Sequence, residues 1–318
     1  VARGGILRRG LPVTRARAAV VTNVAADHLG QYGINTVPEL AKVKLSVRRG
    51  LAPDGWLILN AEDAVVRAAA VEFADRAVWF ALDPACDEIR AARQAGRPCG
   101  WLQDGVLRLS DGQGERALIA ASDVPLSLGG VARYNIENAL AAALAAKALG
   151  LPDTAIRQVL GSFRSDLTDN PGRANEFAVN GARVFVDFAH NPHSIAAVTS
   201  ALAAVPARRR FVLLSHAGDR SDEDIRGLVD GAFRLGPDVV VAAENPKYLR
   251  GREPGEIPAL IRQVSRDHGL PPEAILDAAS PFDGAKAIVE RLEPGDLALL
   301  LIHDERDRVF SLLQSYAA

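Results

Sequence analysis

The sequence predicts an α/β protein of two domains, and three observations carry this prediction. The chain has 318 residues, which exceeds one usual domain and suggests two of roughly 150 residues each. Strand-like apolar runs alternate with helical patterns almost throughout, as in mostly parallel sheets covered by helices. Residues 164–177 are polar, contain proline and glycine, and read as a linker, so we expect domains at 1–168 and 169–318.

The predicted elements of the first half are, in order, a strand at 18–23, a helix at 37–52, a strand at 56–60, a helix at 62–76, a strand at 77–82, and helices at 135–149 and 152–163. Gly150 and Pro152 mark the end of one helix and the start of the next. Residues 99–130 show short alternating runs joined by Asp-Gly pairs at 104 and 111, which predict a small antiparallel meander.

The second half predicts a further α/β unit of the Rossmann type. Its predicted strands, joined by amphipathic helices, lie at 183–189, 210–216, 238–244 and 296–303, with a weaker strand near 274–276.

The composition excludes several classes of protein. With 48% hydrophobic and 24% charged residues the chain is globular, and a net charge of -2 argues against a nucleic-acid or anionic membrane surface. No apolar run reaches the roughly 18 residues of a membrane helix. Cys86 and Cys99 lack the spacing of a disulfide framework or zinc site. We therefore expect a cytoplasmic protein. Separately, we expect a homo-oligomer in the full-length form.

Polar residues gather where four predicted strands end, which is where open α/β sheets bind ligands. Loops are polar in any protein, but four such clusters suggest a cleft between the two domains. The residues concerned are Thr22, Asn23, Asp27 and His28, then Asp187, His190, Asn191 and His193, then His216, Gly218, Asp219 and Arg220, and finally Glu244 and Lys247.

In the first half, Asp27, His28 and Lys44 have two interpretations. In the first, Asp27 caps the next helix and His28 is a surface imidazole. In the second, both residues belong to the rim of a metal site. Lys44 lies between Val43 and Leu45, so its ammonium group either reaches out to water or turns into a cleft beside His28. There it would clamp a phosphate or, once modified by carbon dioxide, act as a carboxylate-like metal ligand.

In the second half, the stretch "VDFAHNPHS" at 186–194 is the clearest indication of a ligand-binding site. Asp187 ends a strand, and Pro192 opens a helix whose free N-H groups would lie beside His190, an arrangement suited to phosphate or Mg²⁺-bound oxygens. The alternative is that Asn191 caps the helix and both histidines, His190 and His193, are solvated.

Two asparagines and four arginines complete the candidates. Asn135 and Asn138 lie three residues apart on one helical face and would bond a purine edge, or else serve as N-caps. The arginines, with Asp219 beside one of them, would bind phosphate or a carboxylated substrate, or else lie on the surface; they are Arg173, Arg220, Arg250 and Arg252.

Together these motifs resemble the Mur ligase family, and within it the carboxy-terminal half of the cyanophycin synthetases. The stretches that carry the resemblance include "ARGGILRRGL" (2–11), "VVTNVAADHLGQYGI" (20–34), "ARYNIENALAAALAA" (132–146), "VDFAHNPH" (186–193) and "AGDRSDEDIR" (217–226). The "AHNP" stretch is also similar to folylpolyglutamate synthetases. That substrate class is one alternative, and a non-catalytic nucleotide-binding module is another.

The resemblance implies ATP-dependent amide ligation through an acyl phosphate, here adding arginine to the aspartate β-carboxylate of a peptide-like polymer. It implies that His28 and the carbamate of Lys44 hold Mg²⁺ and that His190 lies close to the γ-phosphate. The remaining implied roles are adenine contacts for Asn135 and Asn138, ATP phosphate and ribose contacts for Arg173 and Asp187, and substrate binding for Asp219, Arg220, Arg250 and Arg252.

One departure from the family concerns the phosphate-binding loop. Mur ligases begin their ATP domain with a glycine-rich P-loop, and no G-x-x-x-x-G-K-[ST] stretch occurs in these residues. We therefore expect the central ATP-binding domain to be N-terminally truncated, and the chain to be inactive alone.

Overall fold

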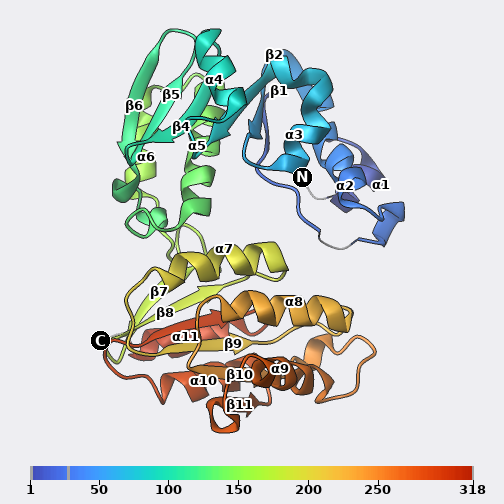
Figure 1. The fold of residues 1–318 in the computed structure, drawn as a ribbon, viewed down its shortest axis with the longest axis vertical. Helices are drawn as coiled ribbons and strands as arrows, with labels where there is room; N and C mark the ends of the chain where they lie inside the picture. Colours follow the sequence, from blue (N-terminus) through green and yellow to red (C-terminus); the bar gives the residue numbers. More distant parts are fainter. Residues whose placement is uncertain (1–2, 27–28, 317–318) are drawn as a thin grey trace. The chain divides into compact units, whose positions relative to one another are not determined.

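The computed structural model describes residues 3–26 and 29–316. The chain forms two compact units, residues 1–163 (unit 1) and 164–318 (unit 2), and each is a sheet with helices on both faces (Figure 1). Over the described residues, no helix is long and apolar enough to cross a membrane.

Unit 1 contains a six-stranded sheet in the order β1-β2-β3-β4-β5-β6. The first four strands are parallel neighbours, and β5 and β6 extend the same sheet as an antiparallel meander. Asp104 and Gly105 both have positive φ, as a tight two-residue hairpin between β4 and β5 requires. The predicted meander is therefore confirmed. The strands are β1 (Ala16–Val21), β2 (Leu51–Asn60), β3 (Ala77–Ala81), β4 (Cys99–Gln103), β5 (Val106–Ser110) and β6 (Glu115–Ala120).

Two hydrophobic clusters cover the two faces of this sheet. One joins it to α2 (Val37–Leu45), α3 (Ala64–Ala70) and α4 (Asp87–Gln94). The other joins it to α5 (Arg133–Ala148) and α6 (Asp153–Ser162). A short helix, α1 (Arg3–Arg9), precedes β1. The core of unit 1 thus lies on both sides of the sheet, as the near-continuous apolar strands predict.

Two helices predicted in unit 1 are shorter than expected. The helix predicted at 37–52 ends at Leu45 and continues as a 3-10 turn to Gly50, after which β2 begins. A Cβ at Gly50 would lie 2.6 Å from the carbonyl oxygen of Val13, so this glycine allows a close backbone approach at the point where the chain changes direction. The helix predicted at 62–76 similarly becomes a 3-10 turn after Ala70.

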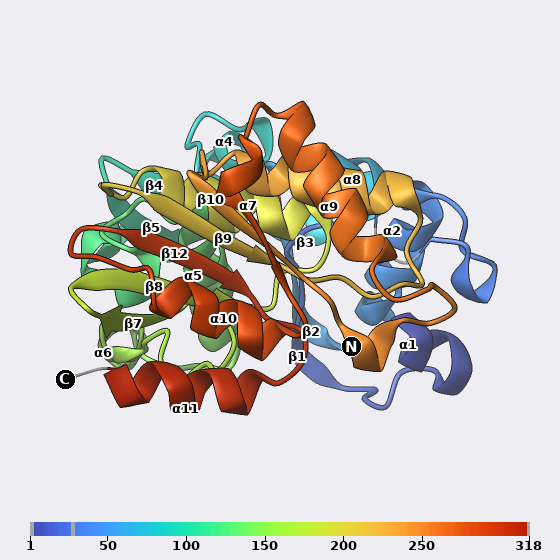
Figure 2. The ribbon, with the colours of Figure 1, turned by 90° about the horizontal axis from the view of Figure 1, so that it is seen from below.

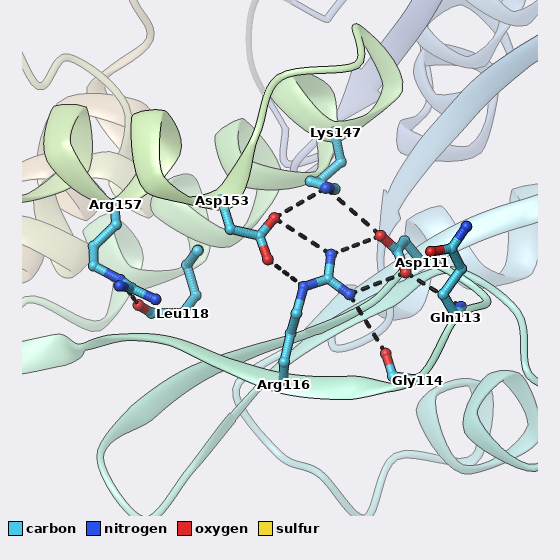
Figure 3. Close-up of polar contacts among 8 residues, drawn as sticks. All are labelled: Asp111, Gln113, Gly114, Arg116, Leu118, Lys147, Asp153 and Arg157. Atoms are coloured by element: carbon cyan, nitrogen blue, oxygen red, sulfur yellow. Dashed lines mark hydrogen bonds and ion pairs between the residues drawn. The ribbon is translucent and has the colours of Figure 1, made fainter.

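A network of four charged residues ties the meander to α5 and α6 (Figure 3). Arg116 on β6 lies between Asp111 and Asp153, with its Nη2 2.7 Å from an oxygen of Asp111. Lys147 on α5 lies 2.9 Å from Asp153 and 3.6 Å from Asp111. All four side chains are partly buried, so the network fixes both helices against the meander. This anchors α5, whose first turns carry Asn135 and Asn138.

Unit 2 contains a second six-stranded sheet in the order β11-β10-β9-β12-β8-β7. All neighbouring strands are parallel except β7, which pairs antiparallel with β8. Strand β12 lies between β8 and β9, so the loops that follow these three strands meet at one edge. The strands are β7 (Asn175–Val179), β8 (Ala182–Asp187), β9 (Arg210–Leu214), β10 (Val239–Ala243), β11 (Ile275–Ala278) and β12 (Leu297–Leu301).

Helices cover both faces of the unit 2 sheet, with α7, α8 and α9 on one face and α10 and α11 on the other (Figure 2). This is the expected Rossmann-like arrangement. The helices are α7 (Pro192–Ala203), α8 (Asp222–Phe233), α9 (Glu256–Asp267), α10 (Pro281–Val289) and α11 (Arg306–Tyr316).

The stretch interpreted as a linker, 164–177, is partly regular structure. Its last residues begin β7, which the sequence did not predict. The buried Asn175 accepts a hydrogen bond from the backbone N-H of Gly172 and donates to the carbonyls of Asp166 and Asn170. One amide side chain therefore fixes the turn that carries Arg173.

Candidate functional site

Asp187, the last residue of β8, lies at the centre of the candidate site in unit 2. Its two carboxylate oxygens accept hydrogen bonds from the backbone N-H groups of Ala174, at 2.8 Å, and Ala189, at 2.6 Å. Burial raises the pKa of Asp187, against the opposing effect of these N-H groups and of the charge of Arg173. Asp187 thus holds the Arg173 turn against the loop that follows β8.

Three of the predicted ATP-site residues come together at this end of β8. Besides Asp187, the guanidinium of Arg173 lies over the ring of Phe188, 5.9 Å from its centroid, and the ring of His190 meets Phe188 edge-on at 5.4 Å. His190 Nδ1 lies 3.1 Å from the carbonyl oxygen of Phe188. Phe188, His303 and Arg306 line an open pocket here. A partly exposed aromatic ring with basic groups beside it suits a nucleotide polyphosphate.

Asn191 has the role given by the alternative interpretation, since its side chain caps α7. Its Oδ1 accepts from the N-H of Ser194 at 2.9 Å, and the Ser194 hydroxyl in turn accepts from the N-H of Asn191. His193 is exposed on the first turn of α7, as the same interpretation expects.

Two further histidines lie beside this cluster: His216, one of the polar residues expected at a strand end, and His303, which was not among the candidates. His303, after β12, places Nδ1 2.8 Å from the carbonyl oxygen of Ser215 and Nε2 2.9 Å from that of Ala189. The ring of His216 lies 5.9 Å from the ring of His303. Burial lowers the pKa of His216 well below its usual value, so this imidazole is neutral at pH 7. A sequence signal for His303 was available, because it closely follows the apolar strand β12.

The predicted substrate residues form the loop after β9 and its neighbour after β10. Asp219 pairs with Arg250, and Arg252 donates to the backbone carbonyls of Gly218 and Arg220. The guanidinium of Arg252 therefore shapes the loop. The side chain of Arg220 is partly exposed and has no hydrogen bond or ion pair with the described residues, and its charge acts on His216 and His303. Arg220 is thus best placed to bind an anion.

The asparagines predicted to meet adenine lie on the first turns of α5 in unit 1. The N-cap alternative is wrong, because the cap position is Ala132. Asn135 donates to the carbonyl of Leu126 at 2.8 Å and thereby holds the preceding loop. Asn138 is exposed, with its Nδ2 3.4 Å from the side-chain oxygen of Asn135. Adenine binding by this pair stays a prediction.

The predicted metal ligands are only partly within the described structure. His28 lies outside the described residues, as does Asp27. Lys44 is partly buried on α2, next to the buried Leu45. Among residues 3–26 and 29–316, no group of three or more His, Cys, Asp or Glu is placed to hold a metal ion. Because His28 lies outside the described residues, they do not test the predicted site, and Mg²⁺ binding stays a prediction.

A partly buried carboxyl group lies near the carboxyl end of β2. Glu137 on α5 hydrogen-bonds with Asn60, and burial, together with the negative charges of Glu62 and Asp63, raises its pKa to about 7. Asp63 accepts from the N-H of Val24 at 2.9 Å and so connects this group to the loop after β1. No local pattern of residues pointed to Glu137, because only the fold brings α5 to this strand end.

Solved structures share the fold over most of the chain. MurF from Acinetobacter baumannii matches with a TM-score of 0.61 and 18% identity, covering 94% of this chain and 60% of that one. E. coli FolC in complex with DHPP and ADP matches with a TM-score of 0.66 and 20% identity, covering 95% and 63%.

Curated relatives match at higher identity. Cyanophycin synthetase of Trichormus variabilis is 36% identical over 87% of this chain and 31% of its own length, and that of Crocosphaera subtropica is 34% identical over 94% and 34%. The chain thus spans about a third of the length of these relatives. The Mur ligase middle domain matches residues 6–146, and the Mur ligase glutamate ligase domain matches residues 172–301. The chain belongs to the Mur ligase family.

Proposed function

We propose that this chain is the Mur ligase part of an enzyme that forms amide bonds at the expense of ATP. More finely, we propose that it adds arginine to the aspartate β-carboxylate of a peptide-like polymer, in the cytoplasm and in a homo-oligomer. The names of its relatives support the reaction class. The observation that carries the proposal is the gathering of Arg173, Asp187 and His190 around one strand end.

The proposed reaction has two steps. A carboxylate oxygen of the acceptor takes the γ-phosphoryl group of ATP, and ADP leaves. The amine nitrogen of the incoming amino acid then attacks the acyl carbon and loses a proton, and phosphate leaves as the amide forms. The first step mainly requires that negative charge on the phosphoryl oxygens be stabilised. Fixed positive groups therefore matter more for this step than a single base.

The residues of unit 2 supply such groups. Asp187 accepts two backbone N-H groups and thereby fixes the Arg173 turn relative to the loop of His190. In the proposal, Arg173 and His190 face the phosphates. Arg220 binds the carboxylate of the incoming amino acid, and its loop is held by the hydrogen bonds of Arg252 and the ion pair of Asp219 with Arg250.

Unit 1 contributes further proposed contacts. Asn135 and Asn138 would bind adenine at the start of α5. His28 and a carbamate on Lys44 would bind Mg²⁺, which would neutralise phosphate charge when present.

The test is ATP-dependent phosphate release by the full-length protein, supplied with a β-Asp-Arg primer and arginine. We expect release that requires both additions. His190→Ala should lower kcat by about 100-fold or more, because it removes a group beside the reacting phosphate. His193→Ala is the matched control, since this exposed histidine lies three residues further along, and it should keep wild-type turnover.

Two outcomes would count against the proposal. Phosphate release that depends on a folate acceptor and glutamate would assign the folylpolyglutamate class instead. Nucleotide binding without release, whatever primer and amino acid are added, would mean a non-catalytic binding module.

A further inference from the structure

One imidazole bridges two loops of the candidate site. His303 follows β12, the strand that separates β8 from β9. One ring nitrogen lies 2.9 Å from the carbonyl of Ala189, in the loop after β8, and the other lies 2.8 Å from the carbonyl of Ser215, in the loop after β9. The two loops belong to strands that are not hydrogen-bonded to each other, so the ring spans the width of one strand.

We propose that His303 is a positioning residue that sets the spacing between the loop of His190 and the loop of Asp219 and Arg220. The proposal rests on the proposed function, in which the first loop faces phosphate and the second faces the incoming amino acid. Acyl transfer requires the two reactants to be held at a defined separation, and a misplacement of about 1 Å can cost on the order of 100-fold in rate.

The chemistry of the ring makes this bridge sensitive to protonation. A neutral imidazole has one N-H group, so only one of the two carbonyls can accept a hydrogen bond, whereas an imidazolium satisfies both. Burial lowers the pKa of His303, the positive charges of His190 and Arg220 lower it further, and the two carbonyls raise it. The ring of His216 also faces it, and Asp304, paired with Lys247, follows it in the chain.

A bound anion would therefore change the bridge. Phosphate or carboxylate beside His190 and Arg220 offsets their positive charge and so favours the second N-H of His303. A larger share of liganded sites than of resting sites therefore has an imidazolium that bonds both carbonyls. In this way anion binding strengthens the contact of His303 with both loops and fixes the spacing between them.

The bridge itself is tested by hydrogen–deuterium exchange on the full-length protein. His303→Ala should speed exchange in both 188–191 and 215–221, because each loop loses its contact with the ring. His268→Ala is the matched control: this histidine of unit 2 stacks on Phe233 at 4.2 Å and bonds with Asp230, outside the site. It should leave both loops unchanged. Faster exchange in only one loop, or in neither, would overturn the bridge.

The positioning role is tested by kinetics. His303→Ala should lower kcat by about 10- to 100-fold, and added imidazole should restore part of that loss by filling the vacated space. Two results for His303→Ala would contradict a positioning role. One is a kcat lowered by this amount that added imidazole does not restore, and the other is a kcat equal to that of the wild type. If the wild-type protein shows no ligase turnover, the proposed function fails while the exchange experiment still decides the bridge.

The link to anion binding is tested by ¹⁵N NMR of the histidine rings. Inorganic phosphate should raise the pKa of His303 in the wild-type protein, and the rise should be smaller in Arg220→Gln, which removes one of the two positive charges. If the pKa of His303 does not change with phosphate, anion binding and the protonation of His303 are not coupled.

Discussion

At the scale of single residues, Glu137 shows how the fold changes the chemistry of a side chain. In the sequence it is one acid among others in a helix, but the fold partly buries it near two other carboxylates, Glu62 and Asp63, and beside the amide of Asn60. Its pKa of about 7, against an ordinary 4.5, leaves it about half protonated at neutral pH.

This shift gives a defined dependence of stability on pH. Between pH 4.5 and about 7 the folded protein keeps a proton that the unfolded chain has lost, so stability falls as pH rises through this window. We expect Glu137→Gln to remove this fall and to stabilise unit 1 at pH 8 by on the order of 2 kcal/mol, after allowance for partial exposure. Urea unfolding at pH 5 and pH 8, followed by tryptophan fluorescence, measures both effects.

The control for this prediction is Glu72→Gln, which neutralises an exposed glutamate of the same unit. It should change stability little at either pH. A Glu137→Gln variant with the same pH dependence as wild type would show that Glu137 titrates as it does in the unfolded chain.

At the scale of elements, the network around Arg116 does more than a single surface pair. Arg116 lies between Asp111 and Asp153 and joins β6 to the end of β5 and the start of α6 (Figure 3). Its hydrogen bonds lower the pKa of both aspartates, and Lys147 adds to the effect. The contribution to stability is therefore present above the ordinary aspartate pKa of 3.8 and is lost as pH falls through the lowered values.

We expect Arg116→Ala to lower the free energy of unfolding of unit 1 by about 1 to 3 kcal/mol at pH 7, because it leaves two partly buried carboxylates without their main partner. The difference from wild type should shrink below pH 3.8. Arg90→Ala is the matched control: it breaks one exposed pair with Asp87 and should cost less than about 0.5 kcal/mol. Equal losses in chemical denaturation would contradict a network effect.

At the scale of the whole molecule, each unit has its own apolar core. The three tryptophans, Trp56, Trp79 and Trp101, all belong to unit 1. Their fluorescence reports on that unit, while circular dichroism reports on both. The chain thus has a built-in way to observe the two units separately.

We expect Leu300→Ala, at a fully buried position of β12, to destabilise unit 2 by about 2 to 5 kcal/mol. The fluorescence transition of unit 1 should stay where it is, while part of the circular dichroism transition moves to lower denaturant. Leu140→Ala, equally buried in α5, is the counterpart and should move the fluorescence transition. A fluorescence shift in Leu300→Ala would mean that the two units unfold as one.

Local signals explain which parts of the fold were predictable. Buried parallel strands are near-continuous apolar runs, so β3, β8, β9, β10 and β12 were each predicted to within two residues at either end. The first turn of the meander was predictable because Asp-Gly pairs favour the positive φ that Asp104 adopts. By contrast, β7 went unseen, since this edge strand follows a polar turn fixed by Asn175, and its pairing with β8 is not visible in its own residues.

The sequence by itself determined the family, the α/β class and the strand ends at which the candidate residues lie. Each of these depends on local patterns of residues, which the chain carries without folding. Only the tertiary structure decided which of those residues meet: Arg173 and His190 around Asp187, His303 between two loops, and Glu137 among acids. The physical reason is that contact and burial depend on strand order, and β12 lies between β8 and β9 although more than eighty residues of chain separate it from each.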